Sequence, residues 1–330
     1  MHTERQGSWV HSTHVGRCVV NLLEQKLGTA VAFKNILFAT DFSEVSEAAL
    51  PYVTAMSVRY GSMVHVAHVL PEVTFLRPGA PDPALIGSIY EDAHSNAQEK
   101  IQRLSLRLRE YHHKTYVRHG KVPEVITGLI RDQNVDLLIL GTHGRTGLGK
   151  LVMGSVAEEI FRTALCPVLT VGPRVPSSVP VLQARHDHDL PTQVSCRRIL
   201  YATDLKPDAA HGCSYAVSLA REFRAHLALL HVIEDYGDHL HERPGPIEAT
   251  LRELEELISP DDLLDRPEFA AEYGSPAAVI LRTAAENAAD LIVLGARPAA
   301  AHLMAATHLG GSTVHRVVVG ANCPVLTVRS

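Results

Sequence analysis

Residues 141–155 combine glycines, a serine and flanking apolar segments in a way that suits anion binding. The segment follows an apolar run at 137–140, which predicts a buried parallel strand. It leads into Ser155-Val-Ala-Glu158, a capping-box pattern that predicts the start of an amphipathic helix. Glycines let the backbone approach a ligand closely, and the N–H groups and dipole at a helix start favour negative charge. The sequence therefore predicts a phosphate cradle between this strand and this helix.

A second polar pair, Thr40-Asp41, ends an earlier apolar run at 36–39. In open parallel sheets, ligands bind beyond the carboxyl ends of the strands, where the strand order reverses. If the first and fourth strands are neighbours, one crevice holds a hydroxyl, a carboxylate and the cradle. Because Asp41 would repel phosphate, it better suits an amide, an amino group, a ribose or a metal ion. Alternatively, Asp41 and Asp204 cap the helices that follow them, in the first case through Ser43, and this role is compatible with ligand binding.

Other nucleotide-binding patterns fit the glycine-rich segment less well. Gly144–Lys150 is nearly a P-loop, but Leu151 stands where that motif needs a hydroxyl for magnesium. The glycines also miss the spacing of a dinucleotide-binding loop. Arg145 and Lys150 either neutralise phosphate charge or are solvated cations of the loop.

The chain is internally duplicated. Four blocks recur in the same order: 36–41 as 199–204, 66–69 as 229–232, 136–141 as 290–295, and 166–171 as 323–328. Each copy spans about 130–140 residues, enough for a domain with its own core. We expect an N-terminal extension at 1–32, a first domain at 33–173, a linker at 174–196 and a second domain at 197–330.

Each copy alternates apolar runs with helical patterns. In the first, strands are expected near 35–40, 63–69, 114–118, 136–140 and 167–171, and helices near 44–60, 84–112, 122–133 and 155–164. This alternation predicts an α/β fold with a parallel sheet covered on both faces. Pro51 either kinks the first helix or marks a first turn.

Composition limits the classes of function. The net charge of −5 over 330 residues gives no basic field for nucleic acid. No apolar run approaches the roughly 20 residues that a membrane-spanning helix needs. The five cysteines form no CxxC, and Cys166 and Cys323 occupy equivalent positions, which indicates packing in a reducing cytosol.

The twenty histidines do not by themselves predict a metal centre. His186-Asp-His188 falls in the expected linker and His239-Leu-His241 in an expected loop, and neither has the spacing of a zinc site. His68 and His231 recur at equivalent strand ends, which favours packing near the crevice. No Ser-His-Asp or Cys-His arrangement can be assembled, so nucleophilic catalysis has no support.

The sequence resembles the universal stress protein family in its tandem form. The family pattern G-x2-G-x9-G-[ST] is matched by Gly141, Gly144, Gly154 and Ser155. The Ala-Thr-Asp at 39–41 and the Cys-Pro-Val-Leu-Thr-Val at 166–171 are also similar to the family. The resemblance covers about 33–172 and 197–329. It implies two tandem adenine-nucleotide alpha-hydrolase-like, Rossmann-like domains, each a five-stranded parallel sheet of order 3-2-1-4-5 flanked by helices.

The resemblance also implies that the first copy binds ATP, either alone or together with Mg²⁺. By matching position, the adenosine side would be lined by Ala39, Thr40 and Asp41, and Val69 would pack near the adenine. Leu140, Gly141 and Gly144 would border the ribose and phosphates, and Gly154, Ser155 and Val156 would hold the phosphates.

The second copy departs from this pattern. Gly295 is kept, but Pro298 takes the place of the next glycine and supplies no N–H. Twelve residues rather than nine separate it from Gly311, and His315 replaces the acidic capping residue. We therefore expect a crevice that lacks a complete phosphate cradle.

These observations predict a cytosolic ATP-binding stress-response protein rather than an enzyme, with slow hydrolysis at most. The resemblance also implies that the copies pair through 168–171 and 325–328 as an intramolecular pseudo-dimer, with a further homodimer possible. Two alternatives stay open. One is an interaction module that binds no nucleotide, and the other is an enzyme acting on an adenylated substrate. Protein partners are unknown, and neither nucleic acid nor a membrane is expected as a partner.

Overall fold

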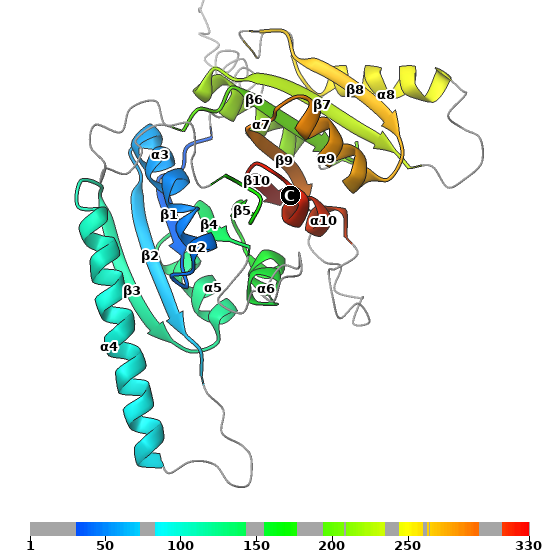
Figure 1. Ribbon diagram of the computed structural model, residues 1–330. Coiled ribbons are helices and arrows are strands. Elements are labelled where there is room, and N and C mark those ends of the chain that lie inside the picture. The colour runs from blue at the N-terminus through cyan, green and yellow to red at the C-terminus, as the bar shows by residue number, and fades with distance from the viewer. Residues whose placement is uncertain are drawn as a thin grey trace, which may run out of the picture. The chain divides into compact units, whose positions relative to one another are not determined.

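The computed structural model describes residues 31–72, 83–142, 155–176, 194–207, 209–234, 244–259, 263, 265–296 and 312–329. In the first copy, strands and helices alternate along the chain (Figure 1). Its strands are β1 (Asn35–Ala39), β2 (Met63–Leu70), β3 (His113–His119), β4 (Leu137–Gly141) and β5 (Val168–Val171). Its helices are α2 (Glu44–Glu47), α3 (Leu50–Tyr60), α4 (Pro83–Arg107), α5 (Val122–Asp132) and α6 (Ser155–Thr163). Each observed strand lies within one residue of the bounds expected from the sequence.

The second copy repeats this arrangement. Its strands are β6 (Arg198–Thr203), β7 (His226–Ile233), β8 (Glu268–Tyr273), β9 (Leu291–Ala296) and β10 (Val325–Arg329). Its helices are α7 (Ala209–Phe223), α8 (Pro244–Glu256), α9 (Pro276–Glu286) and α10 (Thr313–Gly320). The described residues include no counterpart of the short helix α2 between β6 and α7.

The strands form one sheet of order β3-β2-β1-β4-β5-β10-β9-β6-β7-β8. Within each copy all neighbours are parallel, which confirms the expected order 3-2-1-4-5 twice. The first and fourth strands are adjacent, with Ala39 in register with Leu140. The strand order therefore reverses between β1 and β4, and between β6 and β9.

The two copies meet through their last strands, as the resemblance implied. β5 and β10 pair antiparallel, with Leu169 opposite Leu326. Thr170 Oγ1 donates to the carbonyl of Val325 at 3.1 Å. The equivalent Thr327 Oγ1 donates to the carbonyl of Val168 at 3.2 Å. These reciprocal contacts have the self-complementary character of a two-fold interface within one chain.

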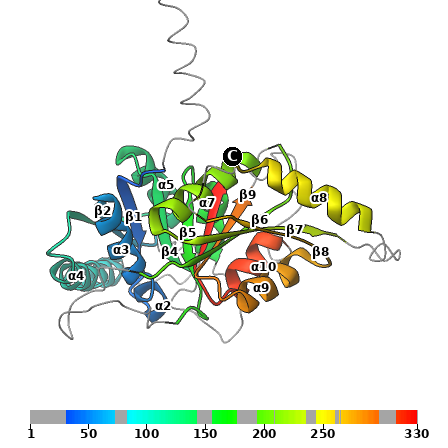
Figure 2. The same cartoon turned by 90° about the horizontal axis from the view of Figure 1, so that it is seen from above.

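Helices cover both faces of the strands because successive side chains point to opposite sides. In the first copy, α3 and α4 lie on one face and α5 on the other (Figure 2). Ala67, Val69, Leu138 and Leu140 pack with residues of α5 and α6 in one buried cluster. The corresponding cluster in the second copy joins β6, β7 and β9 to α9 and α10. The near-continuous burial of β1, β2 and β4 explains their apolar sequences.

The expected first helix at 44–60 is two helices rather than one. α2 ends at Glu47, and α3 begins at Leu50 with Pro51 in its first turn. Proline fits there because its missing N–H is not needed by the first turn of a helix. The sequence indicated this break through Pro51, although the expected range ran across it.

The buried cysteines are thiols that fill the core. Cys166 and Cys323 are buried and unpaired. Burial raises the pKa of each thiol to about 12, so neither is a thiolate at neutral pH. Their packing role, expected from their equivalent positions, agrees with this.

Candidate functional site

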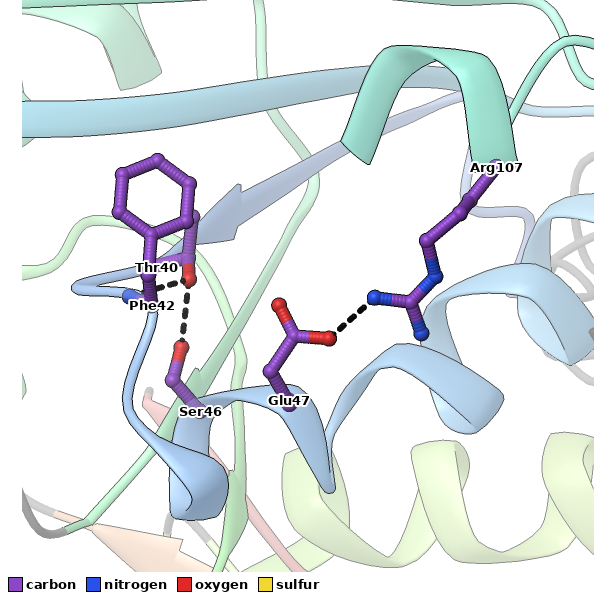
Figure 3. Close-up of polar contacts among 5 residues, drawn as sticks. All are labelled: Thr40, Phe42, Ser46, Glu47 and Arg107. Atoms are coloured by element: carbon purple, nitrogen blue, oxygen red, sulfur yellow. Dashed lines mark hydrogen bonds and ion pairs between the residues drawn. The ribbon is translucent and has the colours of Figure 1, made fainter. Parts of the chain in front are cut away.

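A tight turn at the carboxyl end of β1 forms the first part of the site (Figure 3). The hydroxyl oxygen of Thr40 accepts a hydrogen bond from the N–H of Phe42 at 3.0 Å and one from Ser46 Oγ at 2.8 Å. Phe42 adopts a left-handed backbone with φ of 60°, which is uncommon for a residue other than glycine. The Thr40 side chain therefore holds the turn in its shape.

The same turn recurs in the second copy. Leu205 has a φ of 53°, and its N–H donates to Thr203 Oγ1 at 3.1 Å. The left-handed residue is therefore a duplicated feature of the fold and not strain specific to one site.

Asp41 stabilises the start of α2. Its Oδ1 accepts hydrogen bonds from Ser43 N at 3.0 Å and Ser43 Oγ at 2.6 Å. Ser43 is the N-cap residue, and its Oγ accepts from the N–H of Ser46 at 3.2 Å. The alternative in which Asp41 acts through Ser43 is thus what the structure shows, and it uses one carboxylate oxygen. Glu47 of α2 also forms an ion pair with Arg107 of α4 (Figure 3).

His68 and His231 reinforce the two turns from the neighbouring strand. His68 Nδ1 lies 2.8 Å from the carbonyl oxygen of Thr40, and His231 Nδ1 lies 2.9 Å from that of Thr203. A carbonyl only accepts, so each Nδ1 carries the proton. The packing role expected for both histidines is confirmed.

The apolar residues of the predicted site lie together at the carboxyl ends of β1, β2 and β4. Val69 and Leu140 are buried in one cluster, and Ala39 packs against it. These three residues come from β2, β4 and β1, which the sheet order places side by side. These three residues, the apolar floor of the predicted site, are core side chains, with only 8% of Val69 and 4% of Leu140 exposed.

Packing alone explains why position 141 is a glycine. A Cβ there would lie 2.9 Å from the carbonyl oxygen of Val45 and 3.0 Å from Ser46 N, both of which are backbone atoms of α2. Its equivalent, Gly295, has no atom of the described residues within 4 Å of the same position. Close packing of α2 on β4 therefore requires the first glycine, whether or not a ligand approaches it.

The rest of the predicted cradle falls largely beyond the described residues. Gly144 and Gly154 lie outside them, as do His143, Arg145 and Lys150. Ser155 and Val156 are the first two residues of α6. The helix start expected after the glycine-rich segment is therefore in place.

The second copy has a cavity of about 440 Å³ at the corresponding edge. Its wall includes Thr203, Asp204, Leu294 and Gly295, the equivalents of predicted site residues in the first copy. Lys206 Nζ lies 3.7 Å from Asp204 Oδ2. At the start of α10, the N-cap Ser312 accepts a hydrogen bond from the N–H of His315 at 3.1 Å. The crevice expected in the second copy is therefore present.

Sequence reasoning missed a cavity of about 270 Å³ on the α4 side of the first copy. The ring centroids of Phe42 and His68 are 4.5 Å apart, and Lys100 Nζ lies 5.9 Å from the Phe42 ring centroid. His68 and Leu70 point to the opposite face of β2 from Val69. The alternation of side chains between the two faces of β2 is the sequence feature that could have indicated this cavity.

Two general findings concern the described residues only. Among them, no group of three or more His, Cys, Asp or Glu side chains could hold a metal ion. Within the same ranges, no helix has both the length and the apolar character needed to cross a membrane.

The sheet order, the paired last strands and the polar turn at each first strand define a tandem pair of Rossmann-like domains. A family model described as the universal stress protein family matches residues 32–172 and 195–329. The chain belongs to the universal stress protein family.

Individual relatives agree with this assignment. The chain is 30% identical over 156 residues to universal stress protein MJ0577 of Methanocaldococcus jannaschii, covering 43% of this chain and 96% of that protein. It is 26% identical over 310 residues to a universal stress protein of Mycolicibacterium smegmatis, covering 89% of this chain and 96% of that one. A solved universal stress protein from Archaeoglobus fulgidus shares the fold, with a TM-score of 0.64 at 23% identity over 90% of this chain and 97% of that one.

Proposed function

We propose that the chain is a cytosolic stress-response protein whose first copy binds ATP, alone or with Mg²⁺. Bound nucleotide would bias the conformation of the protein or its choice of partner. Membership of the universal stress protein family supports the stress-response role.

The observation that carries the proposal is the meeting of three features at one sheet edge. The Thr40-Asp41 turn ends β1, the apolar floor of Val69 and Leu140 lies beside it, and β4 is the adjacent strand. β4 leads through the glycine-rich segment to the start of α6. A base on the floor and phosphates at a helix N-terminus would match this distribution of apolar and donor groups.

Each predicted residue has a role in this proposal. Ala39, Thr40 and Asp41 line the adenosine side, Val69 packs near the adenine, and Leu140 borders the ribose and phosphates. Gly141 and Gly144 border the ribose and phosphates. Gly154, Ser155 and Val156 supply N–H groups and a hydroxyl to the phosphates.

The test is a calorimetric titration of ATP with magnesium into three forms of the full chain. The wild type and a Gly311→Val, Ser312→Ala control should bind alike, because the control makes the same changes in the second copy. A Gly154→Val, Ser155→Ala variant should lose binding. Retained binding in that variant, with binding lost in the control, would place the nucleotide in the second copy and overturn the proposal.

We propose no catalytic role beyond slow hydrolysis of ATP. The turn carboxylate, Asp41, accepts hydrogen bonds from Ser43, and the sequence supplies no Ser-His-Asp or Cys-His arrangement to support catalysis. Incubation with ATP should release phosphate far more slowly than nucleotide exchanges. Release of AMP or pyrophosphate on a stoichiometric scale would instead support an enzyme acting on an adenylated substrate.

The cavity of the second copy favours a second candidate, a ligand without phosphates. The cavity is formed at the sheet edge, whereas Pro298 and the longer insertion weaken the cradle. Adenosine titrated into the Gly154→Val, Ser155→Ala variant should bind more tightly than ATP. Equal failure of both ligands would leave the second copy as an interaction module.

A further inference from the structure

The sheet of this chain ends in two edge strands, and the outer side of each has no partner strand among the described residues. β3 is at one end of the strand order and β8 at the other (Figure 1). An edge strand presents a row of N–H and C=O groups that can pair with a strand of another chain. The two edges of this sheet carry charged side chains of opposite sign.

We propose that β3 of one molecule pairs with β8 of a second copy of the same chain, so that the sheet continues from molecule to molecule. The pairing is antiparallel, because the antiparallel contact of β5 with β10 already makes the two edge strands run in opposite directions. In the proposed register Thr115 lies opposite Ala271, and each step forward along β3 is a step back along β8.

The backbone of β3 directs alternate residues to its free side. The carbonyl of His112 accepts a hydrogen bond from the N–H of Val64 on β2 at 2.8 Å, and the N–H of Gly120 donates to the carbonyl of Leu70 at 3.1 Å. The N–H and C=O of one residue point to the same side of a strand, and the side alternates from residue to residue. The residues that direct these groups away from β2 therefore include Thr115 and Val117.

The backbone of β8 fits this pattern. The N–H of Gly274 donates to the carbonyl of Ile233 on β7 at 3.0 Å, so Phe269 and Ala271 direct their N–H and C=O groups away from β7. The register places these two residues opposite Val117 and Thr115. Outward-facing groups thus meet outward-facing groups, as the hydrogen-bonded pairs of an antiparallel ladder require. The side chains brought together are apolar or small.

The charged side chains of both edges lie on one face of the sheet. Tyr116, in the middle of β3, packs against the core cluster of α5 and α6, and Ala270 of β8 packs against that of α9 and α10. Ala157 and Val314 pack against both clusters, so the two clusters cover the same face. Residues two positions apart on a strand share a face, so the charged neighbours of Tyr116 and Ala270 lie on this face as well.

Opposite charges meet in this register. Lys114 comes opposite Glu272, and Arg118 comes opposite Glu268. Each carboxylate also has a partner in its own molecule, and it can accept from a second cation because it has two oxygens; these partners are Arg282 and His226. Opposite charges across neighbouring strands stabilise a sheet, whereas like charges destabilise it.

The same charges select head-to-tail assembly. Pairing of β3 with β3 would bring Lys114 and Arg118 against basic side chains, and pairing of β8 with β8 would bring glutamates together. The favoured contact joins two different edges, so each added molecule leaves one edge of each kind available. The expected product is an open row of molecules, and its formation does not depend on the proposed nucleotide function.

The first experiment is sedimentation velocity of the wild-type chain at low salt, from micromolar to millimolar concentration. The mean mass should rise with concentration above the 36.0 kDa of one chain. It should fall again at high salt, because salt screens charges at an exposed contact. A mass that stays constant over this range would overturn the proposal.

A proline substitution tests the backbone contact. Thr115→Pro removes an outward N–H and leaves the hydrogen bonds to β2 in place, an arrangement that edge strands tolerate. This variant should stay at the mass of one chain, whereas the control Thr115→Val keeps the N–H and should associate like the wild type. Circular dichroism checks that both are folded. Wild-type association of a folded Thr115→Pro variant would show that β3 is not the contact.

Charge reversal tests the choice of partner edge. A Lys114→Glu, Arg118→Glu variant carries two acidic edges, and a Glu268→Lys, Glu272→Lys variant carries two basic ones. Each folded variant should stay at the mass of one chain when it is alone, because like charges would meet. An equimolar mixture should associate, because each variant supplies the edge that the other needs. The inference is wrong if either variant associates alone like the wild type, or if the mixture does not associate.

Discussion

Several residues of the sequence motifs also stabilise the fold, a role that the motifs themselves do not indicate. The Ala-Thr-Asp motif looks like a ligand-binding element, yet Thr40 shapes the backbone of Phe42 and Asp41 holds the N-cap of α2. Gly141 belongs to the glycine motif, yet packing against α2 already requires it. A motif residue can therefore serve the fold and a ligand together.

Gly141 and Gly295 offer a matched test of this point. In Gly141→Ala the new methyl group meets backbone atoms of α2, so we expect a loss of about 1–3 kcal/mol in the free energy of unfolding. In Gly295→Ala the new methyl group meets no atom of the described part of the chain, and we expect a change of less than about 0.5 kcal/mol. Urea unfolding monitored by circular dichroism measures both. Equal effects of the two substitutions would show that packing of α2 on β4 does not explain the first glycine.

His65 makes the stability of the folded protein depend on pH. It is buried on β2, with Nδ1 3.0 Å from the hydroxyl of Tyr116. Burial, and then the charge of Lys114, lower the pKa of His65 below its usual value of 6.5. The unfolded chain thus binds the proton first as the pH falls, so the stabilisation is complete above about pH 6.5 and is lost as the pH drops toward the folded pKa.

The corresponding measurement compares the wild type with His65→Gln. The stability of the wild type should fall more steeply than that of the variant when the pH is lowered from 7 through 6.5. Unfolding midpoints in urea at a series of pH values give both slopes. Parallel curves would mean that His65 does not contribute to the pH dependence.

At the scale of elements, the pairing of β5 with β10 is accompanied by complementary side chains. Arg59 of α3 lies against Glu222 of α7, with Nε 2.6 Å from Oε1. Its guanidinium also lies 5.8 Å from the ring centroid of Phe223. Arg59 and Glu222 are 163 positions apart, the same offset that relates Asp41 to Asp204. Equivalent positions in the two copies therefore carry opposite charges where they meet.

A charge-swap cycle tests this complementarity. Arg59→Glu and Glu222→Arg should each lower stability by more than the roughly 0.2–1 kcal/mol of an exposed pair, because each places like charges together. The double swap should recover most of the loss. Thermal unfolding gives the coupling between the two positions. Additive losses in the double variant would show that the two side chains do not interact.

The sequence predicted elements better than it predicted contacts. The apolar runs located β1, β2, β4 and β5, because a buried parallel strand leaves a continuous hydrophobic signal. The edge strand β3 was expected at 114–118 although its sequence is largely polar and partly exposed. The break between α2 and α3 was indicated by Pro51 but not placed. The complementary charges of β3 and β8 were not foreseen, since they depend on the face and the direction that the sheet gives to each edge strand. The role of Gly141 depended in the same way on the position of α2.

At the scale of the whole chain, duplication has kept the scaffold and allowed the loops to diverge. Both copies retain the sheet order, the left-handed residue after the threonine, and the histidine bonded to its carbonyl. They differ in α2, which the described part of the second copy lacks, and in the sequence that follows β4 and β9. Divergence at the sheet edge, where ligands bind, is consistent with one nucleotide site per chain rather than two.

The number of ATP molecules bound by one folded chain tests this account most directly. Calorimetric titration of the wild-type chain with ATP and magnesium should give a stoichiometry near one. Two sites of equal affinity would contradict the proposed difference between the copies. No binding by a chain shown to be folded by circular dichroism would contradict the nucleotide function altogether.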